Sequence, residues 1–355
     1  MISVLVLSKY DRLAASPRHR FIQFQPGLEA EGIHLEVSPL LDDAYVRERF
    51  DSGRSRASHT VRALFRRAMA LLEARRWDLV IVHCELVPYL MPMFERIALM
   101  GVPYLYDYDD AIFHMYDIHP NPIVRRLLGN KIGQIISRSQ GVLAGSHYLE
   151  EYARRFHSNV HWMPTVIDLT RYQIREVEQR QSLVVGWIGS PSTSAYLDEV
   201  RDALSLLAQE GPVKLLAVGA KPLSIPGVEV EVRAWSEDRE VADLLECDLG
   251  IMPLPDNPWT RGKCAFKLIQ YMACGLPCIA SPVGANREVV STESGLLASD
   301  TQQWLHTLRT LRDDPQLRQR LGAAGRERVE RDFCMQSQVG RLARIIRDAA
   351  GNRKG

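Results

Sequence analysis

The sequence has no long apolar run and contains little lysine, and we first consider which kinds of segment or protein these shortages exclude. None of its apolar runs approaches the ~20 residues that a helix needs to cross a bilayer, so we expect no transmembrane segment. The start, Met1–Leu7, lacks the basic leader and longer apolar region of a signal peptide, so we expect a cytoplasmic protein. Lysine supplies seven of the 44 basic residues, a bias that GC-rich coding explains. The net charge of +1 provides no global field that would favour nucleic acid.

Paired cysteines are also missing. The six cysteines stand singly in apolar or motif segments, and only Cys274 and Cys278 are close in sequence. Their surroundings indicate a helix end followed by a strand, and no zinc or redox spacing is present. We therefore expect reduced thiols without a metal or disulfide role.

The chain length and the pattern of short apolar runs indicate two α/β domains. A chain of 355 residues exceeds what one hydrophobic core supports, so two domains of about 150–180 residues are expected. In the first half, runs typical of strands alternate with helical patterns, which predicts a parallel sheet with right-handed crossovers. The expected strands are 2–7, 34–37, 79–83, 102–106, 141–144 and 160–163. The expected helices are 18–31 (with a break at Pro26-Gly27), 57–75, 124–137 and 148–156.

A second series follows a polar stretch. Its expected strands are 183–188, 213–218, 228–232, 249–252 and 277–280, and its expected helices are 195–209, 237–245 and 266–274. From 299 to 347 the pattern is nearly all helical, with a break at Asp314-Pro315. We predict an N-terminal Rossmann-like domain at 1–165, a hinge at 166–181, a second such domain at 182–330 and a C-terminal helix at 331–355 that returns toward the first domain.

The most informative loop follows the expected strand 249–252. This proline-rich loop, and the helix that it opens near Gly262–Ala265, carry three cations: Arg261, Lys263 and Lys267. Free N–H groups and the helix dipole make such an N-terminus an anion site. Cations there would neutralise a departing diphosphate. The alternative is a cationic first turn that meets solvent, an arrangement that the helix dipole opposes.

A family resemblance begins in this loop. Lys267–Pro277 (KLIQYMACGLP), followed by Ser281–Asn286 (SPVGAN), resembles the donor-binding signature of family-4-like GT-B glycosyltransferases. The shorter pieces that fall in the expected order are Asp109-Asp110, Gly145-Ser146, Gly186–Ser190 and Asp248–Ile251. The resemblance implies two Rossmann-like domains facing across a cleft, with the donor held by the second.

The implied reaction moves a hexose from a UDP or GDP sugar to a hydroxyl group of a glycan or lipid-linked acceptor. Bacterial surface-glycan or glycoconjugate synthesis is the expected setting, and no cofactor or metal is expected to be required. The same fold also supports nucleotide-sugar epimerases and hydrolases, and a non-catalytic sugar-binding protein is a third class. Product analysis separates them, because only transfer consumes donor in an acceptor-dependent way.

The signature departs from the family at two positions. The family usually has a Glu, seven residues and a second Glu, where this sequence has Gly262 and Gln270. By resemblance the second Glu binds the donor ribose, which Gln270 can also do. The first Glu contacts the donor sugar, and Lys263 or Asp256 would have to replace it. Asn286 is a further expected contact.

The loop after strand 183–188 contains Gly189, Ser190 and Thr193. Glycine permits close backbone approach, and hydroxyl and N–H groups at a helix start suit phosphate oxygens. The alternative, a simple N-cap for the helix from Ala195, is compatible with this role.

Three carboxylates, Asp107, Asp109 and Asp110, end an N-domain strand. They repel one another, so at least one should have a raised pKa. By resemblance Asp109 stands where the family often has a catalytic His, and we expect it to act as the base that deprotonates the acceptor. Asp107 and Asp110 are the other candidates. A structural carboxylate or a metal site made by the same acids is the alternative.

Further basic residues of the N-domain are ambiguous. Arg18 and Arg20 follow the first strand, where they would contact donor phosphate or an anionic acceptor, or form solvated surface. His83 ends a strand as a buried, satisfied side chain or as a catalytic one.

Two basic segments predict peripheral binding at the inner face of the plasma membrane. Between Ser52 and Trp77 the only acid is Glu73. The arginines there are 54, 56, 62, 66, 67, 75 and 76, beside an apolar stripe of Val61, Leu64, Phe65, Ala68, Met69, Leu71 and Leu72. The acid-free stretch 118–140 holds Arg125, Arg126, Lys131 and Arg138. Such helices suit anionic lipids or a polyprenyl diphosphate. Alternatively they pack on the sheet with solvated arginines.

Overall fold

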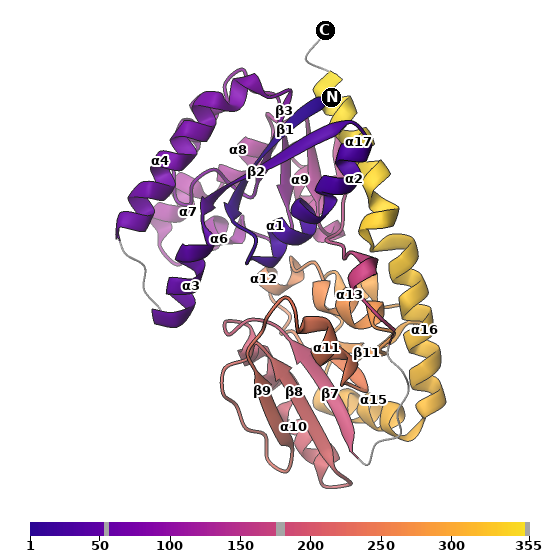
Figure 1. The fold of residues 1–355 in the computed structure, drawn as a ribbon. Helices are drawn as coiled ribbons and strands as arrows, with labels where there is room; N and C mark the ends of the chain where they lie inside the picture. The colour runs from indigo at the N-terminus through magenta and orange to yellow at the C-terminus, as the bar shows by residue number, and fades with distance from the viewer. Residues whose placement is uncertain (53–56, 175–181, 352–355) are drawn as a thin grey trace. The chain divides into compact units, whose positions relative to one another are not determined.

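The computed structural model describes residues 1–52, 57–174 and 182–351, and its contacts divide the chain into two compact units (Figure 1). Unit 1 comprises Met1–Val166, Gly262–Cys264 and Met335–Gly355. Unit 2 comprises Ile167–Arg261 and Ala265–Cys334. Each unit contains one six-stranded sheet of parallel strands.

The sheet of unit 1 has the order β2-β1-β3-β4-β5-β6. Its strands are β1 (Ile2–Tyr10), β2 (Ile33–Leu41), β3 (Leu79–His83), β4 (Tyr104–Tyr108), β5 (Gly141–Ala144) and β6 (Val160–Trp162). After β1 the chain adds β2 on one side and then returns to add β3 on the other. Ligands of open α/β sheets bind at such a reversal, outside the carboxyl ends of the strands.

Helices cover both faces of this sheet, which explains why its central strands read as continuous apolar runs. The first series is α1 (Ala15–Arg20), α2 (Gln25–Ala30), α3 (Asp43–Ser52), α4 (Ala57–Glu73), α5 (Pro92–Ala98) and α6 (His114–Asp117), with 3₁₀ turns η1 (Ile22–Phe24) and η2 (Ala74–Arg76). The remainder are α7 (Pro122–Leu128), α8 (Lys131–Ile136), α9 (His147–Arg154) and α17 (Met335–Gly351). One core packs α2 and α17 on Val4, Val6 and Ile81, and the opposite core uses Leu5, Val80 and Val82.

The sheet of unit 2 has the order β12-β11-β10-β7-β8-β9, so its direction reverses at β7. Its strands are β7 (Leu183–Ile188), β8 (Val213–Val218), β9 (Glu229–Arg233), β10 (Leu249–Met252), β11 (Cys278–Ala280) and β12 (Gly295–Leu297). The helices are α10 (Asp198–Ala208), α11 (Glu240–Leu245), α12 (Pro258–Arg261), α13 (Phe266–Ala273), α14 (Asn286–Val289), α15 (Thr301–Asp313) and α16 (Pro315–Asp332), with η3 (Leu169–Arg171) and η4 (Ser194–Leu197).

Helix α13 lies directly against this sheet. Tyr271 of α13 accepts a hydrogen bond from Ile188 N at 3.1 Å and donates one to Ile251 O at 3.1 Å. A Cβ on Gly250 of β10 would lie 2.2 Å from the Tyr271 ring, so this close approach requires glycine. The contact ties the helix that carries Lys267 and Gln270 to the central strands.

The two parallel sheets and the helical C-terminal region confirm the predicted α/β fold class. Several helix predictions were wrong in detail. The expected break at Pro26-Gly27 falls at Phe21 instead, because Pro26 sits in the first turn of α2, where it is tolerated. The expected helix 124–137 is two helices, α7 and α8. Strand β12 was missed, and a second break separates α16 from α17.

Parts of the predicted hinge and of the basic segment fall on residues that the structure does not describe. Of the predicted hinge, residues 175–181 lie outside the described part of the chain, as do Arg54 and Arg56 of the basic segment. No helix among the described residues is long and apolar enough to cross a membrane.

Candidate donor and catalytic sites

In unit 2, two glycines and the side chain of one lysine lie together at the carboxyl ends of β7 and β8. Gly219 follows β8 with a φ of +77°, and a Cβ on it would lie 2.2 Å from the Gly189 carbonyl oxygen. A Cβ on Gly189 would lie 2.8 Å from Lys267 Nζ. The place is the strand reversal of this sheet, where open α/β sheets bind ligands.

The amino group of Lys267 is held over an aromatic ring. Its Nζ lies 4.1 Å from the centre of the Trp187 ring, a cation–π contact. Helix α13 begins at Phe266, after Ala265 in a left-handed conformation with a φ of 56°, and no side chain caps its first turn. Of the three predicted cations, Lys267 alone lies in that first turn. The expected helix 266–274 is confirmed, and Arg261 and Lys263 precede it.

The hydroxyl groups after β7 bond to their own loop. Thr193 Oγ1 accepts from Ser190 N at 3.2 Å and donates to Ser190 O at 3.0 Å. The structure gives the 3₁₀ turn η4 no side-chain cap from Thr193, so the interpretation of this loop as a helix N-cap was wrong. These bonds fix the loop that starts at Gly189.

Gln270 belongs to a buried polar chain. Its Nε2 donates to Tyr172 Oη at 3.2 Å, and that hydroxyl donates to Glu240 Oε1 at 3.1 Å. Trp235 Nε1 donates to Glu240 Oε2 at 3.0 Å. The sequence analysis did not identify Tyr172, Trp235 or Glu240 as site residues. Glu240 could have been identified, because it is an acidic residue at the start of a helix that follows a strand.

The other predicted donor residues have partners of their own. Arg261 Nε pairs with Asp256 Oδ1 at 2.6 Å on the surface, and Asn286 is buried and donates to Ser281 O at 2.9 Å. Residues 262–264 group with unit 1. There, a Cβ on Gly262 would lie 2.2 Å from Ala111 Cβ, and Lys263 Nζ donates to Asp110 Oδ1 at 3.0 Å.

In unit 1, Arg20 and Asp107 form a buried ion pair. Arg20 Nε donates to Asp107 Oδ1 at 2.8 Å, and its Nη1 donates to Met163 O at 2.9 Å and Thr165 Oγ1 at 3.2 Å. Burial alone would raise the pKa of Asp107, but Arg20 and then His83 outweigh it and lower that pKa. Arg18 is also buried, so the interpretation of these arginines as solvated surface was wrong.

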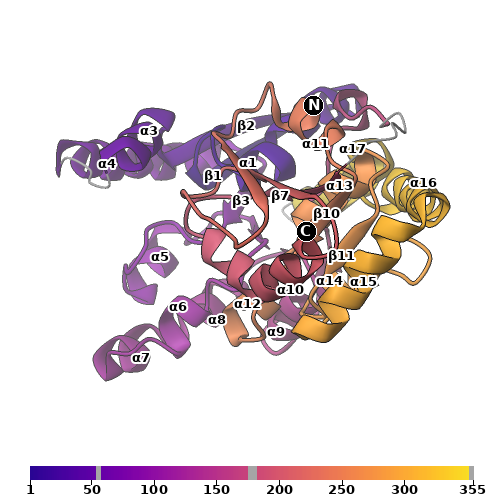
Figure 2. The ribbon, with the colours of Figure 1, turned by 90° about the horizontal axis from the view of Figure 1, so that it is seen from below.

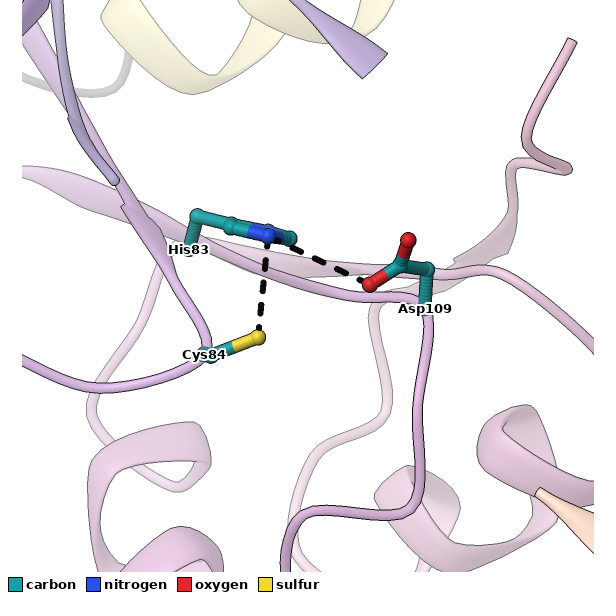
Figure 3. Close-up of side chains that lie close together, drawn as sticks. All are labelled: His83, Cys84 and Asp109. Atoms are coloured by element: carbon teal, nitrogen blue, oxygen red, sulfur yellow. Dashed lines mark hydrogen bonds and ion pairs between the residues drawn. The ribbon is translucent and has the colours of Figure 1, made fainter. Parts of the chain in front are cut away.

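His83, Cys84 and Asp109 converge beside this pair (Figure 3). His83 Nδ1 bonds to Asp107 Oδ1 at 2.8 Å, and Nε2 lies 3.7 Å from Cys84 Sγ and 3.9 Å from Asp109 Oδ1. Burial opposes the charged imidazole, but Cys84 and Asp107 raise the pKa of His83 well above its ordinary value. Burial raises the pKa of the Cys84 thiol.

The expectation of one raised carboxyl pKa is confirmed at Asp110. Desolvation raises its pKa, which Lys263 only partly offsets and the Asp109 charge reinforces. Asp107 and Asp110 thus each hold a cation, whereas Asp109 Oδ1 lies beyond hydrogen-bonding distance of His83.

The basic segments are only partly on the surface. Arg67 of α4 is buried and donates to the Ser8 carbonyl, and Lys131 is buried between Glu85 Oε2 at 2.6 Å and Glu95 Oε1 at 3.0 Å. Both were predicted to belong to basic surface, and both predictions were wrong. Conversely, members of the apolar stripe of α4 are exposed: Val61, Leu64, Phe65, Met69 and Leu72.

Comparison with known proteins adds to this geometry. Residues 182–314 match the model of the family described as "Glycosyl transferases group 1". The chain is 26% identical over 198 residues to a GDP-mannose-dependent alpha-(1-6)-phosphatidylinositol dimannoside mannosyltransferase of Mycobacterium tuberculosis. That match covers 51% of this chain and 51% of the relative, so it spans about half the length of the curated relative.

Two solved structures are similar over nearly their full length. Sucrose-phosphate synthase of Thermosynechococcus elongatus superposes with a TM-score of 0.71 at 15% identity, over 99% of this chain and 100% of that one. HepE of Anabaena, solved with UDP and glucose, has a TM-score of 0.65 at 15% identity, over 98% and 99% of the two chains. The fold is that of the GT-B glycosyltransferases. Within this fold, the resemblance to the group 1 glycosyl transferases is carried by the segment 182–314.

The Arg20–Asp107 pair gives a stability prediction. Arg20→Met leaves the buried Asp107 carboxylate without its cation, so we expect unfolding free energy to fall by about 3–5 kcal/mol at pH 7. Because the folded pKa of Asp107 is depressed, the pair stabilises the protein above the ordinary carboxyl pKa of 3.8, and this contribution is lost as pH falls through the folded pKa. The difference between variant and wild type should therefore shrink in acid, as urea titrations at several pH values would show.

The matched control is Arg66→Met. Arg66 pairs with Asp42 at 3.0 Å in a half-exposed position, and such pairs contribute about 1 kcal/mol or less. Equal losses for the two variants would contradict the special role given to Arg20.

Proposed function

We propose that this protein is a glycosyltransferase whose unit 2 holds a nucleoside-diphosphate sugar of the UDP or GDP type. The observation that carries the proposal is the meeting of Gly189, Gly219 and Lys267 at the strand reversal of unit 2. All three lie inside the segment that matches the group 1 family. The relatives support the donor class, since one is named as GDP-mannose-dependent and another was solved with UDP and glucose.

The geometry suits a diphosphate in particular. Two glycines let the loops after β7 and β8 pack closely beside Lys267, and an uncapped helix start offers N–H groups to an anion. Lys267 adds a full positive charge at the same place, which would neutralise the diphosphate as it leaves. Gln270, one turn further along α13, is proposed to bind the donor ribose through its amide.

Lys267→Ala tests the donor site. Loss of one charge-assisted bond, worth about 1.5–3 kcal/mol, should raise the dissociation constants of UDP or GDP about tenfold or more in calorimetric titrations. The control is Lys214→Ala, which removes the same charge on β8, where Lys214 pairs with Glu231 at 2.6 Å. Unchanged nucleotide affinity in Lys267→Ala, or an equal loss in Lys214→Ala, would remove Lys267 from the donor site.

Asp109 of unit 1 is proposed as the base that deprotonates the acceptor hydroxyl. Its carboxylate is buried at the carboxyl end of β4, and Asp107 and Asp110 are held by Arg20 and Lys263. The proton of the acceptor hydroxyl passes to Asp109 as the sugar bond forms and the nucleoside diphosphate departs. Direct attack of this kind inverts the anomeric centre.

Asp109→Asn should lower turnover by about 10²–10⁴-fold, the usual range for loss of a general base. The amide keeps the size of the side chain, so folding and nucleotide affinity should stay as in wild type. NMR of the product decides the mechanism, because retention of the anomeric configuration would exclude Asp109 as a simple base.

The acceptor is proposed to be a glycan or lipid-linked hydroxyl compound of bacterial surface-glycan or glycoconjugate synthesis, met at an anionic membrane face. The relative from Mycobacterium tuberculosis is named for a phosphatidylinositol dimannoside, which is consistent with such an acceptor. In unit 1, Phe65 and Leu72 of α4 are 67% and 75% exposed, beside exposed Arg62. Near α5 and α7 (Figure 2) further exposed apolar residues are Met93, Phe94, Ile97, Ile123 and Leu127.

Vesicle co-sedimentation tests this surface. Wild type should pellet with phosphatidylglycerol-containing vesicles and less so as salt is added, because the charge attraction is screened. The double variant Phe65→Ser/Leu72→Ser loses apolar burial, so its partitioning should fall at least about tenfold. Arg62→Glu should weaken binding further, whereas Arg320→Glu on exposed α16 of unit 2 should not. Equal pelleting with neutral and anionic vesicles would rule the surface out.

A further inference from the structure

Three side chains of different ligand chemistry meet in unit 1, at the margin of its hydrophobic core. One imidazole nitrogen, one sulfur and one carboxylate oxygen, from His83, Cys84 and Asp109, lie within 4.8 Å of one another (Figure 3). All three residues are buried. They come from the ends of the neighbouring strands β3 and β4, at the edge where α/β sheets bind ligands.

We propose that His83 Nε2, Cys84 Sγ and the Asp109 carboxylate bind a transition-metal dication of the Zn²⁺ type. In tetrahedral zinc sites, bonds of about 2.1 Å to nitrogen or oxygen and about 2.3 Å to sulfur place ligand atoms roughly 3.4–3.6 Å apart. The observed 3.7 Å from nitrogen to sulfur and 3.9 Å from nitrogen to oxygen are wider by only a few tenths of an ångström. The third pair, Cys84 Sγ and the Asp109 oxygen, lies within 4.8 Å, so metal binding would draw the sulfur and the carboxylate closer together.

The backbone at Cys84 supports a site rather than a chance contact. Its φ of 67° lies in the left-handed region, which is costly for a residue with a Cβ and is seen most often at functional positions. Two hydrogen bonds maintain this conformation. Cys84 N donates to Asp107 O at 2.7 Å, and Tyr106 Oη donates to Cys84 O at 2.7 Å. Together they hold the sulfur toward His83 Nε2.

The surroundings of His83 match those of a metal-bound imidazole. A ligand histidine usually donates its other N–H to a carboxylate, which fixes the ring and the tautomer. Here Nδ1 bonds to Asp107 at 2.8 Å, and Arg20 in turn holds Asp107. Nε2 is thereby directed toward Cys84 and Asp109.

The identity of the three ligand atoms also determines which metal the site prefers. A thiolate ligand disfavours Mg²⁺ and Ca²⁺, and a set of nitrogen, sulfur and oxygen suits Zn²⁺. With one thiolate and one carboxylate the bound dication is neutralised locally, which a buried site requires. On binding, the Cys84 thiol proton, and the Nε2 proton of a charged His83, are released to solvent. Three protein ligands leave a fourth position open.

Metal binding here would occupy the Asp109 carboxylate and so inhibit transfer, a consequence that rests on the proposed function. The metal would compete with the acceptor proton for that carboxylate. Binding itself is independent of the reaction and can be measured without any substrate.

Cobalt(II) titration of the metal-free, reduced protein tests the site directly. Wild type should bind one Co²⁺ per chain with a thiolate-to-cobalt charge-transfer band in the near ultraviolet, and one Zn²⁺ should displace it. Cys84→Ser should abolish the band, and His83→Gln and Asp109→Asn should weaken metal binding at least about tenfold. Cys278→Ser, which removes a buried cysteine of unit 2, should retain the band.

Circular dichroism would show whether each variant folds. If a variant does not, the cobalt titration of wild type alone still decides the proposal. Absence of a thiolate band in wild type, or a band that survives in folded Cys84→Ser, would overturn the site. An inhibition assay then separates the two proposals. Stoichiometric Zn²⁺ binding without loss of transfer would keep the metal site and remove Asp109 from the reaction.

Discussion

The arrangement of side chains at the carboxyl edge of the unit 1 sheet depends on the ion pair between Arg20 and Asp107. Through one guanidinium group, the end of helix α1, the end of β4 and the chain after β6 are fixed to one another. Asp107 stands opposite His83 in the parallel register of β3 and β4, so the same carboxylate also orients the imidazole. An unpaired carboxylate in this position would be too costly to bury. The placement of His83, Cys84 and Asp109 therefore follows from the pair.

Burial of paired charges recurs in unit 1 and explains where sequence reasoning failed. Lys131 lies between Glu85 and Glu95, and its partners are far from it in sequence. A charge count along the chain sees Lys131 only as part of a basic segment, because the acids that neutralise it belong to another segment. Arg67 is a similar case, with a carbonyl of β1 as its partner. Residue type and local spacing carry no information about such distant partners.

The strands were more predictable than the helices for a physical reason. In parallel sheets both faces are covered, so central strands appear as unbroken apolar runs. The predicted bounds of 79–83, 141–144, 183–188, 213–218 and 249–252 agree with the structure. The three-residue β12 has no β-branched residue and gave no such signal. Helix limits depend on turns such as the one at Phe21, where the chain changes direction with no proline or glycine to indicate it.

The two departures from the donor signature differ in their physical nature, which the sequence could not show. Gln270 keeps a hydrogen-bonding side chain in a buried polar chain with Tyr172 and Glu240. At Gly262, by contrast, no side chain fits, because a Cβ would collide with Ala111. The neighbouring Lys263 donates to Asp110 and so places an ion pair beside Gly262. The loss of one acidic side chain from the signature thus coincides with the supply of another carboxylate, Asp110, from a different strand end. Which charged groups meet at Gly262 therefore depends on the tertiary fold, and the spacing of the signature does not show it.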